Sequence, residues 1–151
     1  MLKEASHILN KHFGFSTFKD GQGEIIENIL KGNNTLGILP TGGGKSLCFQ
    51  IPAQIFQGTT VVISPLISLM KDQVDALSAA NIQATYINSS LQSSEIYERL
   101  QNIRDGKYKL VYVAPERFES DAFINVLNFI DIPLIAFDEA HCISQWGHDF
   151  R

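Results

Sequence analysis

The sequence is poor in the residues that mark secreted, metal-binding and membrane proteins. Only two of its 151 residues are cysteines, Cys48 and Cys142, and they do not stand in the close pairs typical of metal ligands. We therefore expect buried or semi-buried free thiols in a reducing compartment, with no disulfide and no zinc site. No apolar run reaches the roughly 18 residues that span a bilayer, and the first residues lack the apolar core of a signal peptide. These absences predict a cytoplasmic protein with no membrane partner.

Positive charge is also scarce. The chain has 12 lysines and arginines against 16 aspartates and glutamates, a formal net charge of −4, and its basic residues are scattered. Because nucleic-acid binding draws on basic surface, the overall charge gives no support to that function, which must rest on local motifs. The length and the hydrophobic content of 44% fit one domain with a sizeable core, so we expect residues 1–151 to form one domain.

Glycine, by contrast, is concentrated in one short segment. An apolar run at residues 35–39 predicts a strand, and it is followed by Thr41, Gly42, Gly43, Gly44, Lys45 and Ser46. Consecutive glycines let backbone N–H groups turn toward a phosphate, while Lys45 can reach the outer phosphates and Ser46 can ligate magnesium. The segment therefore predicts a site for a nucleoside triphosphate. The strict pattern has glycine where this chain has Leu39, and the plainer interpretation is a glycine-rich turn with a solvated lysine.

Two adjacent carboxylates, Asp138 and Glu139, end another apolar run at residues 133–137. In a parallel α/β sheet, ligands bind outside the carboxyl ends of the strands, so Asp138 is expected to face the same crevice as the glycine-rich segment. We expect Asp138 to hold magnesium through water, and Glu139 to polarise the water that attacks the γ-phosphate. The alternative is a solvated strand end with a capping aspartate.

Apolar runs and helical segments alternate along the chain. The runs predict strands at residues 35–39, 59–64, 84–88, 109–114 and 133–138, and the helical segments are 46–57, 66–80, 93–105 and 120–128. This alternation predicts an α/β fold with a parallel sheet covered by helices on both faces. Uninterrupted hydrophobicity at residues 61–63, 110–113 and 134–137 predicts central strands. Residues 3–31 are predicted to form two helices around a loop at residues 12–22.

That loop holds three phenylalanines, Phe13, Phe15 and Phe18, together with Lys19 and Gln22. A glutamine amide can pair with the N6 and N7 edge of adenine, and Phe15 can stack on the face of the base. The alternative, which the spacing alone favours, is that the phenylalanines are core residues and that Gln22 is an ordinary polar residue at a helix start.

Together these motifs resemble, in order and over nearly the whole chain, the first motor domain of RecQ-type superfamily 2 helicases. The resemblance rests on residues 13–22, 39–48, 64–73, 114–117 and 138–151. It implies a RecA-like P-loop NTPase with a DEAH box, which binds ATP and Mg²⁺ and carries a helical adenine-recognition segment at residues 1–31. By this resemblance Gln22 reads adenine, Phe15 stacks on it and Lys19 assists, although the family more often has tyrosine and arginine at the last two positions.

The resemblance also implies contacts with DNA. Ser64 and Pro65 precede a helix whose N-terminus binds a DNA phosphate, and Lys71 adds charge. Arg117 belongs to a second loop that contacts the DNA backbone. The alternatives are that Lys71 is a solvated helix residue and that Arg117 pairs with a neighbouring glutamate.

An aromatic-rich segment follows the two carboxylates. By the resemblance, Trp146, His148 and Phe150 sense single-stranded DNA by stacking and hydrogen bonding, and His141 couples this signal to the carboxylates. The plainer alternative for Trp146 and Phe150 is core packing.

As a whole, the resemblance implies an ATP-dependent DNA helicase that unwinds 3′ to 5′, acts in DNA repair or recombination, and associates with the nucleoid when on DNA. Its partners are single-stranded and partly duplex DNA and a second RecA-like domain, whose arginine finger is worth about 10³ or more in rate. We expect that second domain to lie beyond residue 151. Because the sequence ends within the aromatic-rich segment, we also expect the first domain to be incomplete and the isolated chain to be inactive or very weak. Two alternatives stay open: an RNA-directed helicase, and a nucleotide- and nucleic-acid-binding module without turnover.

Overall fold

The computed structural model describes residues 2–40 and 44–139. Its internal contacts divide the chain into two compact units, residues 1–57 and residues 58–151, and each unit has its own hydrophobic core. Within the described residues, no helix is both long and apolar enough to cross a membrane.

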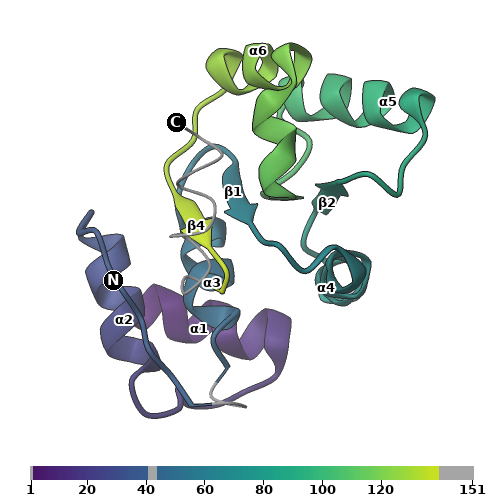
Figure 1. Ribbon diagram of the computed structural model, residues 1–151. Helices are drawn as coiled ribbons and strands as arrows, with labels where there is room; N and C mark the ends of the chain where they lie inside the picture. The colour runs from purple at the N-terminus through teal and green to yellow at the C-terminus, as the bar shows by residue number, and fades with distance from the viewer. Residues whose placement is uncertain (1, 41–43, 140–151) are drawn as a thin grey trace. The chain divides into compact units, whose positions relative to one another are not determined.

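The first unit contains the helices α1 (Leu2–Phe13), α2 (Gln22–Leu30) and α3 (Leu47–Ile55), as Figure 1 shows. In α1, Ala5, Ile8 and Leu9 recur at the spacing of one helix face and are buried. They pack with Ile26 of α2 and Ile51 of α3 into a single core. The two predicted N-terminal helices and the helix after the glycine-rich segment are thus confirmed.

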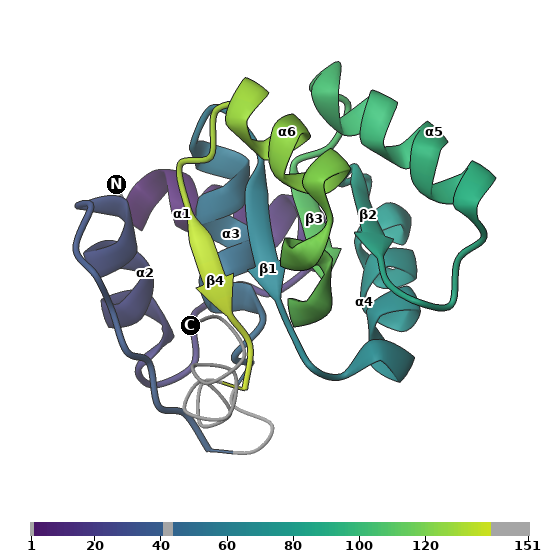
Figure 2. The ribbon, with the colours of Figure 1, turned by 45° about the horizontal axis from the view of Figure 1, so that its top comes forward.

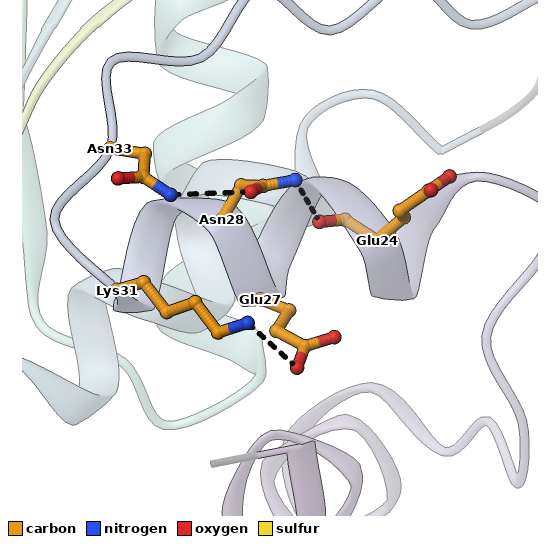
Figure 3. A network of polar contacts seen from close by, with 5 residues as sticks. All are labelled: Glu24, Glu27, Asn28, Lys31 and Asn33. Atoms are coloured by element: carbon orange, nitrogen blue, oxygen red, sulfur yellow. Dashed lines mark hydrogen bonds and ion pairs between the residues drawn. The ribbon is translucent and has the colours of Figure 1, made fainter.

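Polar side chains secure the point where α2 ends (Figure 3). Asn28 Nδ2 donates to the Glu24 carbonyl at 3.0 Å, and Asn28 Oδ1 accepts from Asn33 Nδ2 at 3.3 Å. Lys31 Nζ lies 3.4 Å from Glu27 Oε1, an exposed ion pair of small energetic weight. The contacts of Asn28 therefore tie the segment that begins at Asn33 to the last turns of the helix.

The second unit is built on a parallel sheet with the strand order β2-β3-β1-β4. Its strands are β1 (Thr60–Ile63), β2 (Ala84–Ile87), β3 (Leu110–Val113) and β4 (Ile135–Phe137). Its helices are α4 (Ile67–Ala79), α5 (Ser93–Arg104), α6 (Asp121–Phe129) and the short 3₁₀ helix η1 (Pro115–Glu119).

Helices cover both faces of this sheet, as predicted. Successive strand residues point to opposite faces, and Val61, Ile63, Val111 and Val113 share the face on which α5 and α6 pack. Helix α4 packs against β2, and Figure 2 shows α6 in front of the sheet and α4 behind it. The α/β fold class is confirmed, because a buried parallel sheet between helical layers is the architecture of RecA-like domains.

Four of the five predicted strands and all six predicted helices are confirmed, but the strand predicted at residues 35–39 is wrong. Residues 33–40 form neither helix nor strand, and Leu36 and Ile38 are 74% and 84% exposed. An extended segment becomes a strand only when a neighbour satisfies its backbone N–H and carbonyl groups. No described strand pairs with this segment.

Strand β4 also differs from the prediction. The apolar run at residues 134–137 predicted a central strand, whereas β4 pairs with β1 alone among the described strands and forms an edge of the sheet. Ile135 and Phe137 are accordingly partly exposed, while all residues of β1 and β3 are buried. An apolar run reports the hydrophobicity of a segment and not the number of its neighbours.

Candidate functional site

The glycine-rich segment leads into α3 through a tight turn. Gly44 has a φ of +74°, in the left-handed region that favours glycine. Its carbonyl accepts from the Leu47 N–H at 3.2 Å, and the Lys45 carbonyl accepts from the Cys48 N–H at 3.1 Å. This turn places Lys45, whose side chain is exposed, at the N-terminal end of the helix.

Hydrogen-bond donors are left over at this helix end. Within the described residues, the backbone N–H groups of Lys45 and Ser46 donate to no other group, and Ser46 makes no side-chain capping hydrogen bond although it is the N-cap. Such N–H groups carry partial positive charge, which the helix dipole and the Lys45 ammonium reinforce. The arrangement suits a phosphate group. Thr41, Gly42 and Gly43 lie outside the described residues, and their part in this site stays a prediction.

Gln22 begins α2 and is almost completely buried, with 1% of its surface exposed. Its Nε2 donates to the Gly44 carbonyl at 3.0 Å, and its Oε1 accepts from the Lys19 backbone N–H at 2.8 Å. An ordinary polar residue at a helix start explains the second contact, which is local. It does not explain the first, because that contact joins α2 to the turn before α3, 22 positions along the chain.

The three phenylalanines of the predicted adenine loop fall into two groups. Phe13 and Phe18 are partly buried and pack against the core of the first unit, which agrees with the alternative that the phenylalanines are core residues. Phe15 is 51% exposed and belongs to neither of the two hydrophobic cores. Lys19 is exposed as well. The structure thus separates Phe15 from the core residues, while its contact with adenine stays a prediction.

Cys48 lies in α3, next to the turn. It is a buried free thiol, as predicted, and its Sγ lies 3.9 Å from the Gly44 carbonyl. Burial raises the pKa of Cys48 to about 11, because a thiolate is poorly solvated there. Cys48 is therefore a protonated, unreactive thiol near neutral pH. Cys142 lies outside the described residues.

Other predicted site residues lie at the carboxyl edge of the sheet in the second unit. Ser64 follows β1, Arg117 lies in η1 after β3, and Asp138 follows β4. The last residues of these three strands are paired in register, and the Asp138 N–H donates to the Ile63 carbonyl at 2.9 Å. Parallel strands therefore deliver the three side chains to one edge, where ligands of α/β sheets bind.

Glu139 stands directly after Asp138 and has a φ of +60°. A non-glycine residue in this region is uncommon and costs about 1–3 kcal/mol, and such residues gather at functional positions. The conformation turns the chain sharply at the end of β4, a feature that the two carboxylates did not signal in the sequence.

The turn after β1 is held by Ser64, which is buried. Its Oγ accepts from the Leu66 N–H at 3.1 Å, just before α4 begins. The Pro65 carbonyl accepts from the Ile67 N–H at 3.1 Å. Ser64 thus shapes the start of α4, the helix end at which a DNA phosphate was predicted to bind.

The two basic residues predicted to contact DNA differ in their surroundings. Lys71 Nζ lies 2.7 Å from Asp75 Oδ2 on the exposed face of α4, and this hydrogen bond raises the pKa of Lys71. Lys71 therefore fits its alternative role as a solvated helix residue. Arg117 forms no ion pair with a described residue, which excludes the predicted alternative of pairing with Glu116 or Glu119. Its buried Nε has no hydrogen-bond partner among the described residues either.

One residue at this edge was missed by the sequence analysis. Asn88 follows β2 and is buried, its Oδ1 accepts from the Ser90 N–H at 2.9 Å and from the Ser90 hydroxyl, and its Nδ2 donates to Met70 Sδ at 3.5 Å. The only signal in the sequence was an amide directly after an apolar run. Among the described residues, no three His, Cys, Asp or Glu side chains gather into a metal site.

The remaining predicted residues, His141, Trp146, His148 and Phe150, lie outside the described residues. Their roles stay predictions.

Comparison with known proteins agrees with these features. The sequence profile of the DEAD/DEAH box helicase family matches residues 19–151. The chain is 59% identical over 152 aligned positions to the ATP-dependent DNA helicase RecQ of Bacillus subtilis, covering all of this chain and 26% of that protein. It is 51% identical to the protein of the same name from Haemophilus influenzae, covering 97% of this chain and 24% of that protein.

A plant protein extends the similarity. The chain is 43% identical to the ATP-dependent DNA helicase Q-like 5 of Arabidopsis thaliana, covering 95% of this chain and 16% of that protein. The chain thus spans about a quarter or less of the length of these curated relatives. Because the family match covers most of the chain and includes both the glycine-rich segment and the two carboxylates, the chain belongs to the DEAD/DEAH box helicase family, as a motor domain of the RecQ type.

Proposed function

We propose that this chain is the ATP-binding motor domain of an ATP-dependent DNA helicase, in which ATP hydrolysis is coupled to the binding of single-stranded DNA. The observation that carries the proposal is the start of α3, where the Lys45 and Ser46 N–H groups have no acceptor within the described residues and the Lys45 side chain is exposed. Such a group of donors is suited to binding a phosphate. The names of the relatives, which are ATP-dependent DNA helicases, support the same conclusion.

The site residues have separate roles in this proposal. Lys45 and the N–H groups of the turn neutralise the phosphates, and Gln22 with Phe15 holds the base. Ser46 and Asp138 supply oxygen ligands of the kind that Mg²⁺ prefers, and bound Mg²⁺ would neutralise charge on the phosphate oxygens. Glu139 accepts the proton of the attacking water. His141 couples this carboxylate to DNA binding.

Arg117 is the strongest described candidate for a DNA backbone contact. Its buried Nε donor lacks a partner in the described protein, and a buried donor left unsatisfied costs about 1–3 kcal/mol. A phosphate oxygen would satisfy it, and Ser64 and Pro65 lie at the same edge of the sheet. Lys71 contributes less, because Asp75 already occupies its ammonium group. We further propose that the bases of single-stranded DNA stack on or hydrogen-bond with Trp146, His148 and Phe150.

Several finer features belong to the proposal through the RecQ resemblance. The whole protein unwinds single-stranded or partly duplex DNA 3′ to 5′ in repair or recombination, works in the cytoplasm on the nucleoid, and has a second RecA-like domain that supplies an arginine finger. Residues 1–151 act as one domain in it, and the isolated chain hydrolyses ATP slowly or not at all.

The test is ATPase activity of the whole protein, measured with ATP and Mg²⁺ against increasing single-stranded DNA or RNA of the same sequence. Stimulation by DNA is the expected result. Stronger stimulation by RNA would favour an RNA-directed helicase, and ATP binding without phosphate release in any condition would favour a binding module without turnover.

A further inference from the structure

The hydrogen bond between Gln22 and Gly44 connects the proposed base site to the proposed phosphate site. We propose that Gln22 is a positioning residue: it holds the Gly44 carbonyl, orients the turn before α3, and thereby supports the binding of a polyphosphate chain whether or not an adenine is attached. This inference rests on the proposed nucleotide site and extends the role of Gln22 from the base to the phosphates.

The contact is built into the core of the first unit. Gln22 is 99% buried, its Nε2 lies 3.0 Å from the Gly44 carbonyl oxygen, and its Oε1 is held by the Lys19 N–H at 2.8 Å. An amide held at both ends in a buried site has little rotational freedom, so its position is set before any ligand binds. Gln22 therefore presents a fixed donor to the turn.

Gly44 is adapted to this close approach. A Cβ atom built on Gly44 would collide with Gln22 Nε2, and the φ of +74° is a conformation that other residues adopt at a cost. The Gly44 carbonyl also accepts from the Leu47 N–H at 3.2 Å and lies 3.9 Å from Cys48 Sγ. Donors from two helices thus converge on this one carbonyl.

The hydrogen bond from Gln22 to the Gly44 carbonyl also orients a donor of the proposed phosphate site. The Gly44 carbonyl and the Lys45 N–H belong to the same planar trans peptide group and point in opposite directions. By holding the carbonyl, Gln22 directs the Lys45 N–H away from itself, and that N–H has no acceptor within the described residues. A donor fixed in this way costs less to order when a phosphate binds.

The inference makes a prediction that adenine recognition does not. In the whole protein, Gln22→Met keeps the size and neutrality of the side chain but removes the donor to Gly44. We expect it to lower the affinity for ATP and the affinity for inorganic tripolyphosphate, each about two- to tenfold, which is the usual effect of one neutral hydrogen bond. Calorimetric titration measures both affinities. Without ligand, hydrogen exchange of the Leu47 and Cys48 amides should become faster, because both amides donate into the turn.

Ile26→Val is the matched control, because Ile26 is fully buried one turn further along α2 and does not contact the turn through a polar group. It should lower the melting temperature and leave tripolyphosphate affinity unchanged. If tripolyphosphate affinity falls in step with melting temperature in both variants, the role of Gln22 is only structural and the inference is wrong.

Two further results would also overturn it. Weaker ATP binding with unchanged tripolyphosphate binding in Gln22→Met would confine Gln22 to the base, and a wild-type protein that binds ATP but no tripolyphosphate would exclude base-independent binding. A wild-type protein that binds neither ligand would instead show that the proposed nucleotide site is itself wrong.

Discussion

The two units of the chain position their candidate site groups by different means. In the second unit, Ser64, Arg117 and Asp138 follow neighbouring parallel strands, so the backbone ladder of the sheet brings them to one edge. In the first unit, the turn at Gly44 is held by the buried amide of Gln22. A ladder of many backbone hydrogen bonds does not depend on any one side chain, whereas the Gly44 turn loses one of its few hydrogen bonds when Gln22 is replaced.

The largest expected effect tests the sheet edge of the second unit. In the whole protein, Glu139→Gln should lower kcat for ATP hydrolysis about 10²- to 10⁴-fold, the usual contribution of a general base, and leave ATP affinity unchanged. Steady-state phosphate release and calorimetric titration measure the two quantities.

Asp138→Ala is the comparison for that experiment. It should weaken the magnesium-dependent part of ATP binding, because a ligand to the ion is lost. An equal loss of ATP affinity in Asp138→Ala and Glu139→Gln would contradict the separate roles proposed for the two carboxylates.

The next effect tests the phosphate site of the first unit. Lys45→Ala should lower the affinity for ATP about 10- to 100-fold, which corresponds to the loss of one hydrogen bond from a charged group. The melting temperature without ligand should hardly change, because the Lys45 side chain is exposed. Calorimetric titration and thermal unfolding measure both, and wild-type affinity in this variant would remove the phosphate-site assignment.

A smaller effect is expected on DNA binding when either of two basic residues of the second unit, Arg117 or Lys71, is replaced. Arg117→Ala should weaken the binding of single-stranded DNA. It should also reduce the magnitude of the slope of log affinity against log salt concentration by about 0.7, the value for one phosphate contact. Lys71→Ala should change that slope less, because Lys71 is already paired with Asp75 at 2.7 Å. Fluorescence anisotropy at several salt concentrations measures the slopes, and equal changes would mean that the pairing with Asp75 does not persist.

The smallest effect concerns the pH dependence of folding. Because burial raises the pKa of Cys48 to about 11, above the value of about 8.5 for an exposed thiol, the folded state keeps this proton at higher pH than the unfolded state. The resulting stability is complete below about pH 8.5 and decreases as the pH rises toward 11.

Thermal unfolding between pH 7 and pH 11 measures this contribution. Cys48→Ala should flatten the loss of stability over the alkaline part of that range. The same slope in the variant and the wild type would show that the Cys48 thiol does not contribute to it.

Much of this molecule followed from its sequence alone. The alternation of apolar runs with helical segments predicted β1 to β4 and all six helices, because period and hydrophobicity are local properties. The glycine-rich segment and the pair Asp138 and Glu139 were recognised for a similar reason, since phosphate and magnesium chemistry requires these residue types at a set spacing. The parallel sheet then predicted that Asp138 lies at the carboxyl edge.

Only the tertiary structure decided which segments and side chains find partners. Residues 35–39 are apolar yet unpaired with any described strand, and β4 is an edge of the sheet that the described strands form. Lys71 binds Asp75, and Gln22 binds the Gly44 carbonyl. Apart from the pair of Lys71 and Asp75, each of these outcomes depends on whether two segments that are far apart in the sequence come into contact. Such pairings depend on the free energy of the whole packed arrangement, whereas a sequence pattern reports only which face of a segment is apolar and which residue types it offers.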